Sequence, residues 1–143
     1  MYQNAEQKFA GETRMDRAAL KEYILKQYNV EPDCPWPKHP NFEVFRHAGN
    51  QKWFALAMEV PKEKLGLREN GTLDVVNFKC DPILICAMKN EPGIFPAYHM
   101  NKEKWLTAAL DARVPDDTMK LLLKMSYEAT AGKTLPKKKR GGV

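Results

Sequence analysis

Two aromatic-rich runs on either side of a tight turn restrict the possible folds of this chain more than any other feature. Residues 42–47 (FEVFRH) and 52–60 (KWFALAMEV) flank the segment AGNQ. Such runs around a Gly-Asn turn predict a β-hairpin. The second run is apolar on both faces over much of its length, which favours a central strand. The first strand divides into two faces, Phe42, Val44 and Arg46 on one and Glu43, Phe45 and His47 on the other.

The other elements follow one another at short intervals. Apolar spacing, capping residues and β-branched content predict helices over residues 16–28, 82–90 and 115–131 and strands over residues 73–79 and 105–110. A further strand precedes the last one and completes a second hairpin. The connections lack the long crossovers that parallel strands need. The order helix, three strands, helix, two strands, helix therefore predicts an α+β two-layer domain with an antiparallel five-stranded sheet.

A length of 143 residues allows one domain with a single core. We expect this domain to span residues 15–132. Residues 1–14 show no sustained period and are interpreted as an N-terminal extension. Residues 133–143 lack a core-forming pattern and are interpreted as a flexible basic tail.

The positive charge of the chain comes from this tail. The formal net charge is +5, and residues 133–143 hold five Lys and Arg and no acid. The remaining 18 Lys and Arg equal the 18 Asp and Glu in number, so residues 1–132 are formally neutral. A flexible polycation is expected to add salt-sensitive, sequence-independent affinity for nucleic acid. The tail residues assigned this role are Lys137, Lys138, Lys139 and Arg140.

Several functional classes are not indicated. The three histidines are scattered, and the chain has no G-x-S-x-G motif, phosphate loop or C-x-x-C pair. We therefore predict no catalytic residue, metal site or cofactor. Cys80 and Cys86 adjoin apolar residues and are expected to be small core residues. The longest apolar run, residues 83–88, falls far short of the ~18 residues of a membrane span. The first residues do not resemble a signal peptide, so we expect a cytoplasmic protein without membrane contact.

The stretch YHMNKEKW at residues 98–105 combines aromatic, amide, imidazole and ammonium groups more densely than any other part of the chain. Two interpretations are open. The polar groups would line a pocket for a small ligand, or they would bond the backbone of a structural corner whose tryptophan anchors the last strand. The residues concerned, together with a tryptophan of the first hairpin, are Trp53, Tyr98, His99, Asn101 and Trp105.

Four segments of the sequence resemble the MmcQ/YjbR family of small proteins. They are PAYHMNK at residues 96–102 followed by Trp105, KWFA at 52–55, VVNFKCDP at 75–82, and SY at 126–127. The resemblance extends over about residues 15–131 and implies an α-β(3)-α-β(2)-α fold of the secretion-chaperone or CyaY-like kind. Family members usually carry a further histidine directly before the tryptophan, where this chain has Lys104.

The resemblance also implies a function. The family is described as DNA-binding through a "double wing" of β-hairpins, and for this chain we expect a non-enzymatic DNA-binding protein. In this chain the phosphate contacts would come from Arg46, Lys52, Lys102 and Lys104 together with the tail. The alternatives are a protein-interaction module that uses an exposed sheet face, and the small-ligand site described above. We expect a monomer rather than an obligate oligomer.

The CyaY-like description raises iron binding as well, which an acidic ridge on a helix would provide. The first predicted helix mixes its charges instead, so iron binding is not expected. The charged residues in question are Asp16, Arg17, Lys21, Glu22 and Lys26.

Overall fold

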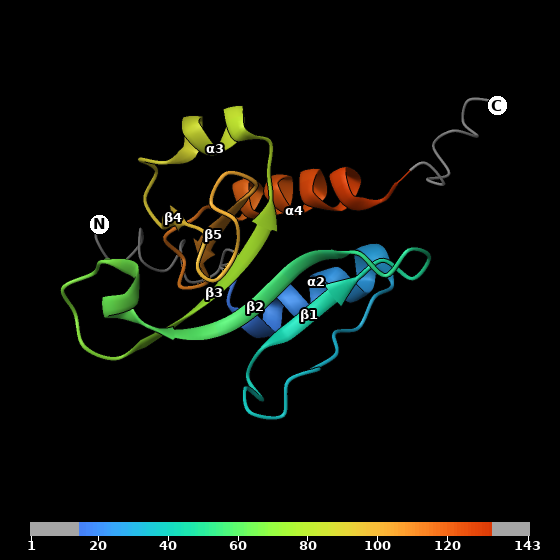
Figure 1. Cartoon of the computed structure of the whole chain (residues 1–143), viewed down its shortest axis with the longest axis horizontal. Helices are drawn as coiled ribbons and strands as arrows, with labels where there is room; N and C mark the ends of the chain where they lie inside the picture. Colours follow the sequence, from blue (N-terminus) through green and yellow to red (C-terminus); the bar gives the residue numbers. More distant parts are fainter. Residues whose placement is uncertain (1–14, 133–143) are drawn as a thin grey trace, which may run out of the picture.

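One antiparallel sheet carries the other elements of the protein, as a computed structural model that describes residues 15–132 shows (Figure 1). The elements are α2 (Arg17–Tyr28), β1 (Glu43–Arg46), β2 (Trp53–Pro61), the 3-10 turn η1 (Lys62–Leu65), β3 (Thr72–Lys79), α3 (Pro82–Met88), β4 (Ile94–Pro96), β5 (Trp105–Ala109) and α4 (Asp116–Thr130). The strands lie in the order β1-β2-β3-β5-β4, each antiparallel to its neighbours. The predicted α+β class, the five strands and the order of elements are confirmed.

The two terminal segments predicted as an extension and a basic tail, residues 1–14 and 133–143, lie outside the described residues. The tail residues expected to bind nucleic acid lie there too. They are Lys137, Lys138, Lys139 and Arg140.

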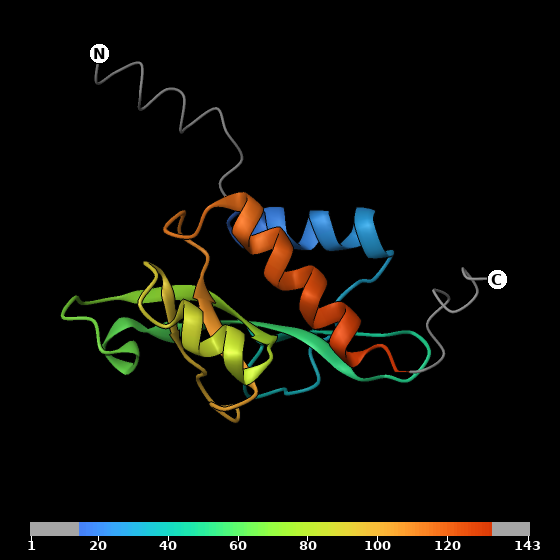
Figure 2. The same ribbon diagram turned by 90° about the horizontal axis from the view of Figure 1, so that it is seen from above.

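Helices α2 and α4 cover one face of the sheet (Figure 2). Apolar side chains of both helices meet aromatic rings from three adjacent strands, and the resulting cluster is the larger of two in the described residues. Because α4 presents apolar residues at intervals of three and four, they form one continuous stripe toward the sheet. Fully buried members of this cluster include Leu20, Ile24, Phe45, Phe54, Phe78, Leu106, Met119, Leu122 and Leu123.

The opposite face of the sheet is covered by connecting segments. Residues 32–42 and 96–104 run along this side, away from α2 and α4 (Figure 2). A smaller cluster is buried beneath them, made of Val44, Leu56, Met58, Val60, Leu73, Val75 and Ala109. Aromatic side chains that pack against it remain half-buried, namely Trp36, Phe42, Trp53, Phe95 and Tyr98. The loop-covered face therefore leaves more aromatic surface accessible than the helix-covered face.

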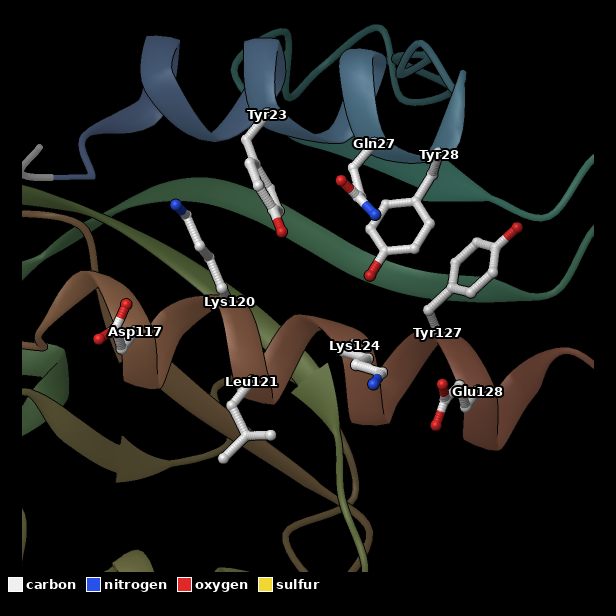
Figure 3. A pocket seen from close by; sticks show the side chains of 9 residues that line it. All are labelled: Tyr23, Gln27, Tyr28, Asp117, Lys120, Leu121, Lys124, Tyr127 and Glu128. Atoms are coloured by element: carbon white, nitrogen blue, oxygen red, sulfur yellow. The ribbon is translucent and has the colours of Figure 1, made fainter.

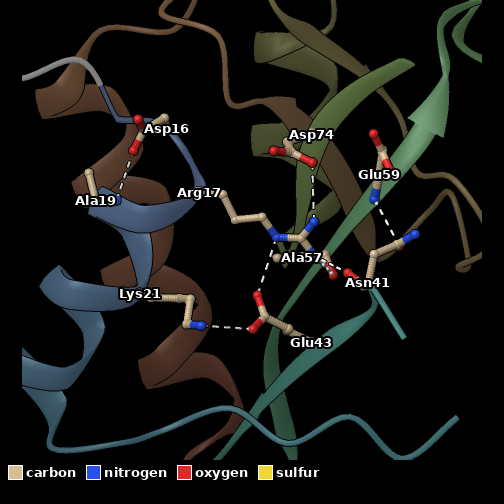
Figure 4. Close-up of polar contacts among 9 residues, drawn as sticks. All are labelled: Asp16, Arg17, Ala19, Lys21, Asn41, Glu43, Ala57, Glu59 and Asp74. Carbon is tan, nitrogen blue, oxygen red and sulfur yellow. Dashed lines mark hydrogen bonds and ion pairs between the residues drawn. The ribbon is translucent and has the colours of Figure 1, made fainter. Parts of the chain in front are cut away.

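Arg17 fixes α2 to the sheet through contacts with three strands and a connecting segment (Figure 4). Its Nε lies 3.2 Å from Glu43 Oε1 in β1, and its Nη1 lies 3.1 Å from Asp74 Oδ1 in β3. Its Nη2 donates to the carbonyl oxygens of Asn41 and, at 3.1 Å in β2, of Ala57. The planar guanidinium carries five donors in fixed directions, which allows one side chain to join these separate elements.

A buried serine of α4 separates β2 from β3 at one end of the sheet. The two strands pair as far as Ala55 and Phe78. Beyond that pair, Ser126 Oγ accepts a hydrogen bond from the Lys79 amide (2.8 Å) and donates one to the Phe54 carbonyl (2.6 Å). The hydroxyl thus satisfies a donor and an acceptor that separated strands would otherwise leave unpaired. From here the β1–β2 hairpin and β3 diverge (Figure 1).

The cysteine prediction is half wrong. Cys80 is buried, and burial raises the pKa of its thiol to about 12. Cys86 is exposed, contrary to the expectation. Helix α3 packs against the core through Leu84, Ile85 and Met88, which share one face, and Cys86 falls outside that face. An apolar local sequence therefore did not reveal which side of this short helix faces the core.

Candidate functional site

Six residues from four strands and their turns gather at one end of the sheet, and we call them the strand-end surface. The end of β1 and the start of β2 lie at the same end of the sheet as the end of β3 and the start of β5, because neighbouring strands run antiparallel. The residues are Arg46, Lys52, Trp53, Lys79, Lys104 and Trp105. Five of them were singled out from the sequence. Lys79 was missed, and its position as the last residue of a predicted strand was the available signal.

The register places the four strand residues Arg46, Trp53, Lys79 and Trp105 on the loop-covered face, whereas Lys52 and Lys104 lie in the segments that lead into β2 and β5. Arg46 is the cross-strand partner of Trp53, and Lys79 that of Trp105. The preceding residue Phe78 and the following residue Leu106 both point into the helix-side cluster. Successive side chains of a strand point to opposite faces, so Lys79 and Trp105 point away from α2 and α4.

Arg46 and Trp53 both make contacts within the protein. Arg46 Nε forms an ion pair with Asp33 Oδ2 at 3.2 Å, and its Cζ lies 6.0 Å from the centroid of the Trp53 ring. Trp53 also meets Trp36 edge-on, with ring centroids 5.5 Å apart. These contacts hold the β1–β2 hairpin to the segment that precedes it. Both residues therefore have a structural role whether or not they meet a ligand.

Trp105 differs from the other two tryptophans. It is half-buried, yet within residues 15–132 it packs against neither apolar cluster and forms no aromatic or cation–π contact. Lys79 lies opposite it on β3, and Lys104 precedes it in an exposed turn. Trp105 is thus a half-buried ring for which residues 15–132 supply no aromatic or cation–π contact, next to a lysine on the paired strand and another in the preceding turn.

The three lysines of the strand-end surface have no acidic partner among the described residues. Lys52, Lys79 and Lys104 form no ion pair with any residue from 15 to 132. An acid adjacent in sequence, Asp81, caps α3 by accepting from the Ile83 amide at 2.7 Å. A formally neutral body therefore presents a local group of unpaired positive charges at this end of the sheet.

Asn101 builds the turn that leads into β5. Its side-chain oxygen accepts from the Glu103 amide (2.8 Å), and its carbonyl oxygen accepts from the amides of Lys104 (3.1 Å) and Trp105 (2.9 Å). An asparagine side chain that bonds the backbone two residues later is a common turn-forming arrangement. This matches the structural interpretation of the stretch for Asn101.

Tyr98 and His99 make different contacts from those of Asn101. The backbone of Tyr98 is held by Thr107 Oγ1 and Asn77 Nδ2, both at 2.9 Å. His99 is exposed at φ 65°, with its ring 4.1 Å from that of Tyr98, and forms no hydrogen bond with the described residues. A hollow of about 190 Å³ is lined by Tyr98 but not by His99 or Asn101. Tyr98 and His99 are thus in contact with each other, Asn101 bonds its own turn, and the ligand site around the three groups stays a prediction.

Lys102 lies apart from the other predicted cations. Its Nζ donates to the Ala97 carbonyl at 3.0 Å, and its side chain lines hollows on both sides of β4. β4 is an edge strand that ends at Pro96, and a lysine laid along such an edge hinders pairing with another strand. The ammonium group of Lys102 is thus bound at the sheet edge.

A second concave region, of about 600 Å³, lies between α2 and α4 (Figure 3). Its rings contact one another and the neighbouring lysine: those of Tyr28 and Tyr127 stack at 4.2 Å, and Lys120 Nζ lies 5.0 Å from the Tyr23 ring centroid. Burial raises the pKa of Tyr28 to about 12. Its lysines are balanced by acids, since the lining includes Lys120, Lys124, Asp117 and Glu128. This groove therefore shows no excess of either charge.

Residues 15–132 contain no group of three His, Cys, Asp or Glu placed to hold a metal ion. None of the helices in this part of the chain is both long and apolar enough to cross a membrane.

Comparison with known proteins gives a consistent result. Residues 25–129 match the model of the YjbR family. The chain is 36% identical over 116 residues to the uncharacterized protein YyaQ of Bacillus subtilis (strain 168), covering 81% of this chain and 98% of that protein. A crystal structure of a Pseudomonas syringae protein matches with a TM-score of 0.80 and 40% identity, over 81% of this chain and 99% of that one. A Deinococcus radiodurans structure, with a TM-score of 0.61, 22% identity and coverage of 89% and 86%, shares the fold.

Proposed function

The chain belongs to the YjbR family, and from this premise we propose that it is a non-enzymatic DNA-binding protein that contacts phosphates through its strand-end surface. The observation that carries the proposal is a group of lysines without ion-pair partners in residues 15–132, namely Lys52, Lys79 and Lys104, on a body that is formally neutral. Lysine and arginine side chains that neutralise phosphates supply most of the sequence-independent affinity for DNA.

The contacts differ from those expected from the sequence. Lys52 and Lys104 remain in the proposed interface, and Lys79 joins them. Arg46 contributes a positive charge that Asp33 partly neutralises, at an Nε–Oδ2 distance of 3.2 Å. Lys102 is bound at the β4 edge and is left out. The basic tail adds nonspecific attraction in this proposal.

The alternative of a protein-interaction module has less support at this surface. Trp53 is enclosed by Trp36 and Arg46, and the remaining tryptophan, Trp105, has a lysine on the opposite strand and another before it. Charged groups so close to the rings interrupt the continuous apolar patch that marks most protein-binding faces.

The test measures duplex DNA affinity against salt concentration, using the full chain with its tail charges removed. The tail variant carries Lys133→Gln, Lys137→Gln, Lys138→Gln, Lys139→Gln and Arg140→Gln. Each phosphate contact contributes about 0.9 to the slope of log K against log salt. Adding Lys52→Gln, Lys79→Gln and Lys104→Gln is therefore expected to reduce the slope by about 2 to 3.

A matched control removes the same charge elsewhere, through Lys26→Gln, Lys64→Gln and Lys124→Gln. This control is expected to keep the slope of the tail variant. If the tail variant has no measurable affinity even at low salt, the strand-end surface does not bind DNA and the proposal is wrong. Equal losses in the two triple variants would show that only net charge matters.

A further inference from the structure

We infer that the strand-end surface binds single-stranded nucleic acid, with one base stacked on the indole of Trp105 and the adjoining phosphates bound by Lys79 and Lys104. The inference rests on the proposed function and adds the class of nucleic acid to it. It also assigns a role to the one tryptophan that the described structure does not otherwise use.

The environments of the three tryptophans carry the inference. Trp36 and Trp53 contact each other and pack against the loop-side cluster, so internal packing explains both. Trp105 is half-buried but meets neither cluster among the described residues. A large ring gains stability by packing, and an indole that lacks an internal partner remains available for stacking on another flat group.

The charges around Trp105 favour a nucleotide as that flat group. Lys79 is its cross-strand partner, and side chains paired in this way lie about 4.5–5.5 Å apart at Cβ. Lys104 precedes the ring in an exposed turn. Proteins that bind single strands combine such cations along the backbone path with aromatic rings on which bases stack. The other cation–aromatic pair of the surface, Arg46 over Trp53, lies across β3 from this site.

The same geometry argues against a duplex as the preferred ligand. Bases of a duplex are stacked on one another, so a ring on a protein surface reaches only unpaired bases. A helix that reads a duplex enters its major groove. Here α2 and α4 cover one face of the sheet (Figure 2), and the strand register places Trp105 on the other face. A sheet face bearing aromatic and basic side chains instead suits an extended single strand.

The experiment uses the full chain in the tail variant and four labelled ligands at one salt concentration. These are a 12-nucleotide oligothymidylate, an abasic strand with the same number of phosphates, a 12-base-pair duplex, and an oligouridylate that distinguishes RNA from DNA. Stacking of one base is expected to make oligothymidylate bind at least about fivefold tighter than the abasic strand. Trp105→Ala is expected to abolish this difference and leave the abasic affinity unchanged, and Trp36→Phe is the control that preserves it.

Two results would overturn the inference. One of them would leave the proposed function standing, and the other would disprove both. Equal binding of oligothymidylate and the abasic strand by the tail variant disproves stacking but leaves phosphate binding intact. Absence of binding to all ligands disproves phosphate binding as well. If Trp105→Ala fails to fold, the abasic comparison with unchanged Trp105 still decides, and Trp105→Phe, which keeps an aromatic ring, is expected to retain part of the difference.

Discussion

The two faces of the sheet are both apolar, but different elements cover them. On the helix-covered face, Phe45, Phe54 and Phe78 are completely buried beneath α2 and α4. On the loop-covered face, Trp36 and Trp53 remain half-buried under connecting segments. A helix presents an unbroken apolar stripe, whereas an irregular segment covers a sheet only where single side chains reach it. The helix-covered face thus provides most of the core, and the loop-covered face keeps rings and charges accessible to a ligand.

Polar groups also differ between the faces. The loop-covered face contains Asn77 and Thr107, which hydrogen-bond to each other and to the backbone of Tyr98. This pair attaches the 96–104 segment to β3 and β5. On the helix-covered face, Ser126 bonds β2 and β3 instead. Each face therefore contains a buried polar connection that positions elements bordering the strand-end surface.

The largest expected effect is on the free energy of unfolding, which we expect to fall more for a substitution on the helix-covered face than for one on the loop-covered face. Phe78→Ala removes a ring from the helix-covered core and is expected to lower the free energy of unfolding by about 3–5 kcal/mol. Trp36→Ala on the loop-covered face is expected to cost less, because that ring is already partly exposed. Urea unfolding of both variants measures the difference. Equal losses would contradict the assignment of the main core to the helix-covered face.

The second prediction concerns the connection made by Ser126. Ser126→Ala leaves the Lys79 amide and the Phe54 carbonyl without their partner, which is expected to cost about 1–3 kcal/mol. Hydrogen exchange at the Lys79 amide is expected to accelerate with it. Lys124→Ala, on the exposed side of the same helix, is the control. Unchanged exchange at Lys79 would show that the hydroxyl does not hold the separated strands.

The third prediction uses pH to test the end of the β1–β2 hairpin. His47 is buried, and its Nε2 donates to Thr130 Oγ1 at 2.8 Å, since the Thr130 hydroxyl itself donates to the Ser126 carbonyl. Burial lowers the pKa of His47 below its ordinary value of 6.5, and contact with the Tyr127 backbone partly opposes this. Between the lowered pKa and about 6.5 the unfolded chain binds more protons than the folded one.

The contribution of His47 to the free energy of unfolding therefore has its full value above pH 6.5. It decreases as the pH falls through and below that value. His47→Gln is expected to remove this part of the pH dependence, measured by urea unfolding at several pH values. His39→Gln changes an exposed side chain and is the control. An identical pH dependence in wild type and His47→Gln would contradict the prediction.

The smallest expected effect concerns the strand-end surface itself. Lys104→Gln alters an exposed side chain without an ion pair among the described residues, so stability is expected to change by no more than about 0.5 kcal/mol. Thermal unfolding measures this. A large loss would mean that Lys104 supports the fold, and its effect on DNA affinity would then no longer report a contact.

The sequence was sufficient to predict the elements and much of the candidate site. Helices and strands followed from apolar spacing, because that signal is local. Arg46, Lys52, Trp53, Lys104 and Trp105 were named because cations beside aromatic rings are visible in one dimension. The bonding role of Asn101 was also anticipated, since its partners lie within four residues.

The tertiary structure decided how those residues are used. Lys79 is included in the strand-end surface because it pairs with Trp105. Lys102 is not included, because its ammonium group binds the Ala97 carbonyl. The role of Ser126 depends on partners 47 and 72 residues away in the chain. Local sequence determines which residues form a strand, but register and packing determine which side chains meet, and these depend on contacts between distant segments.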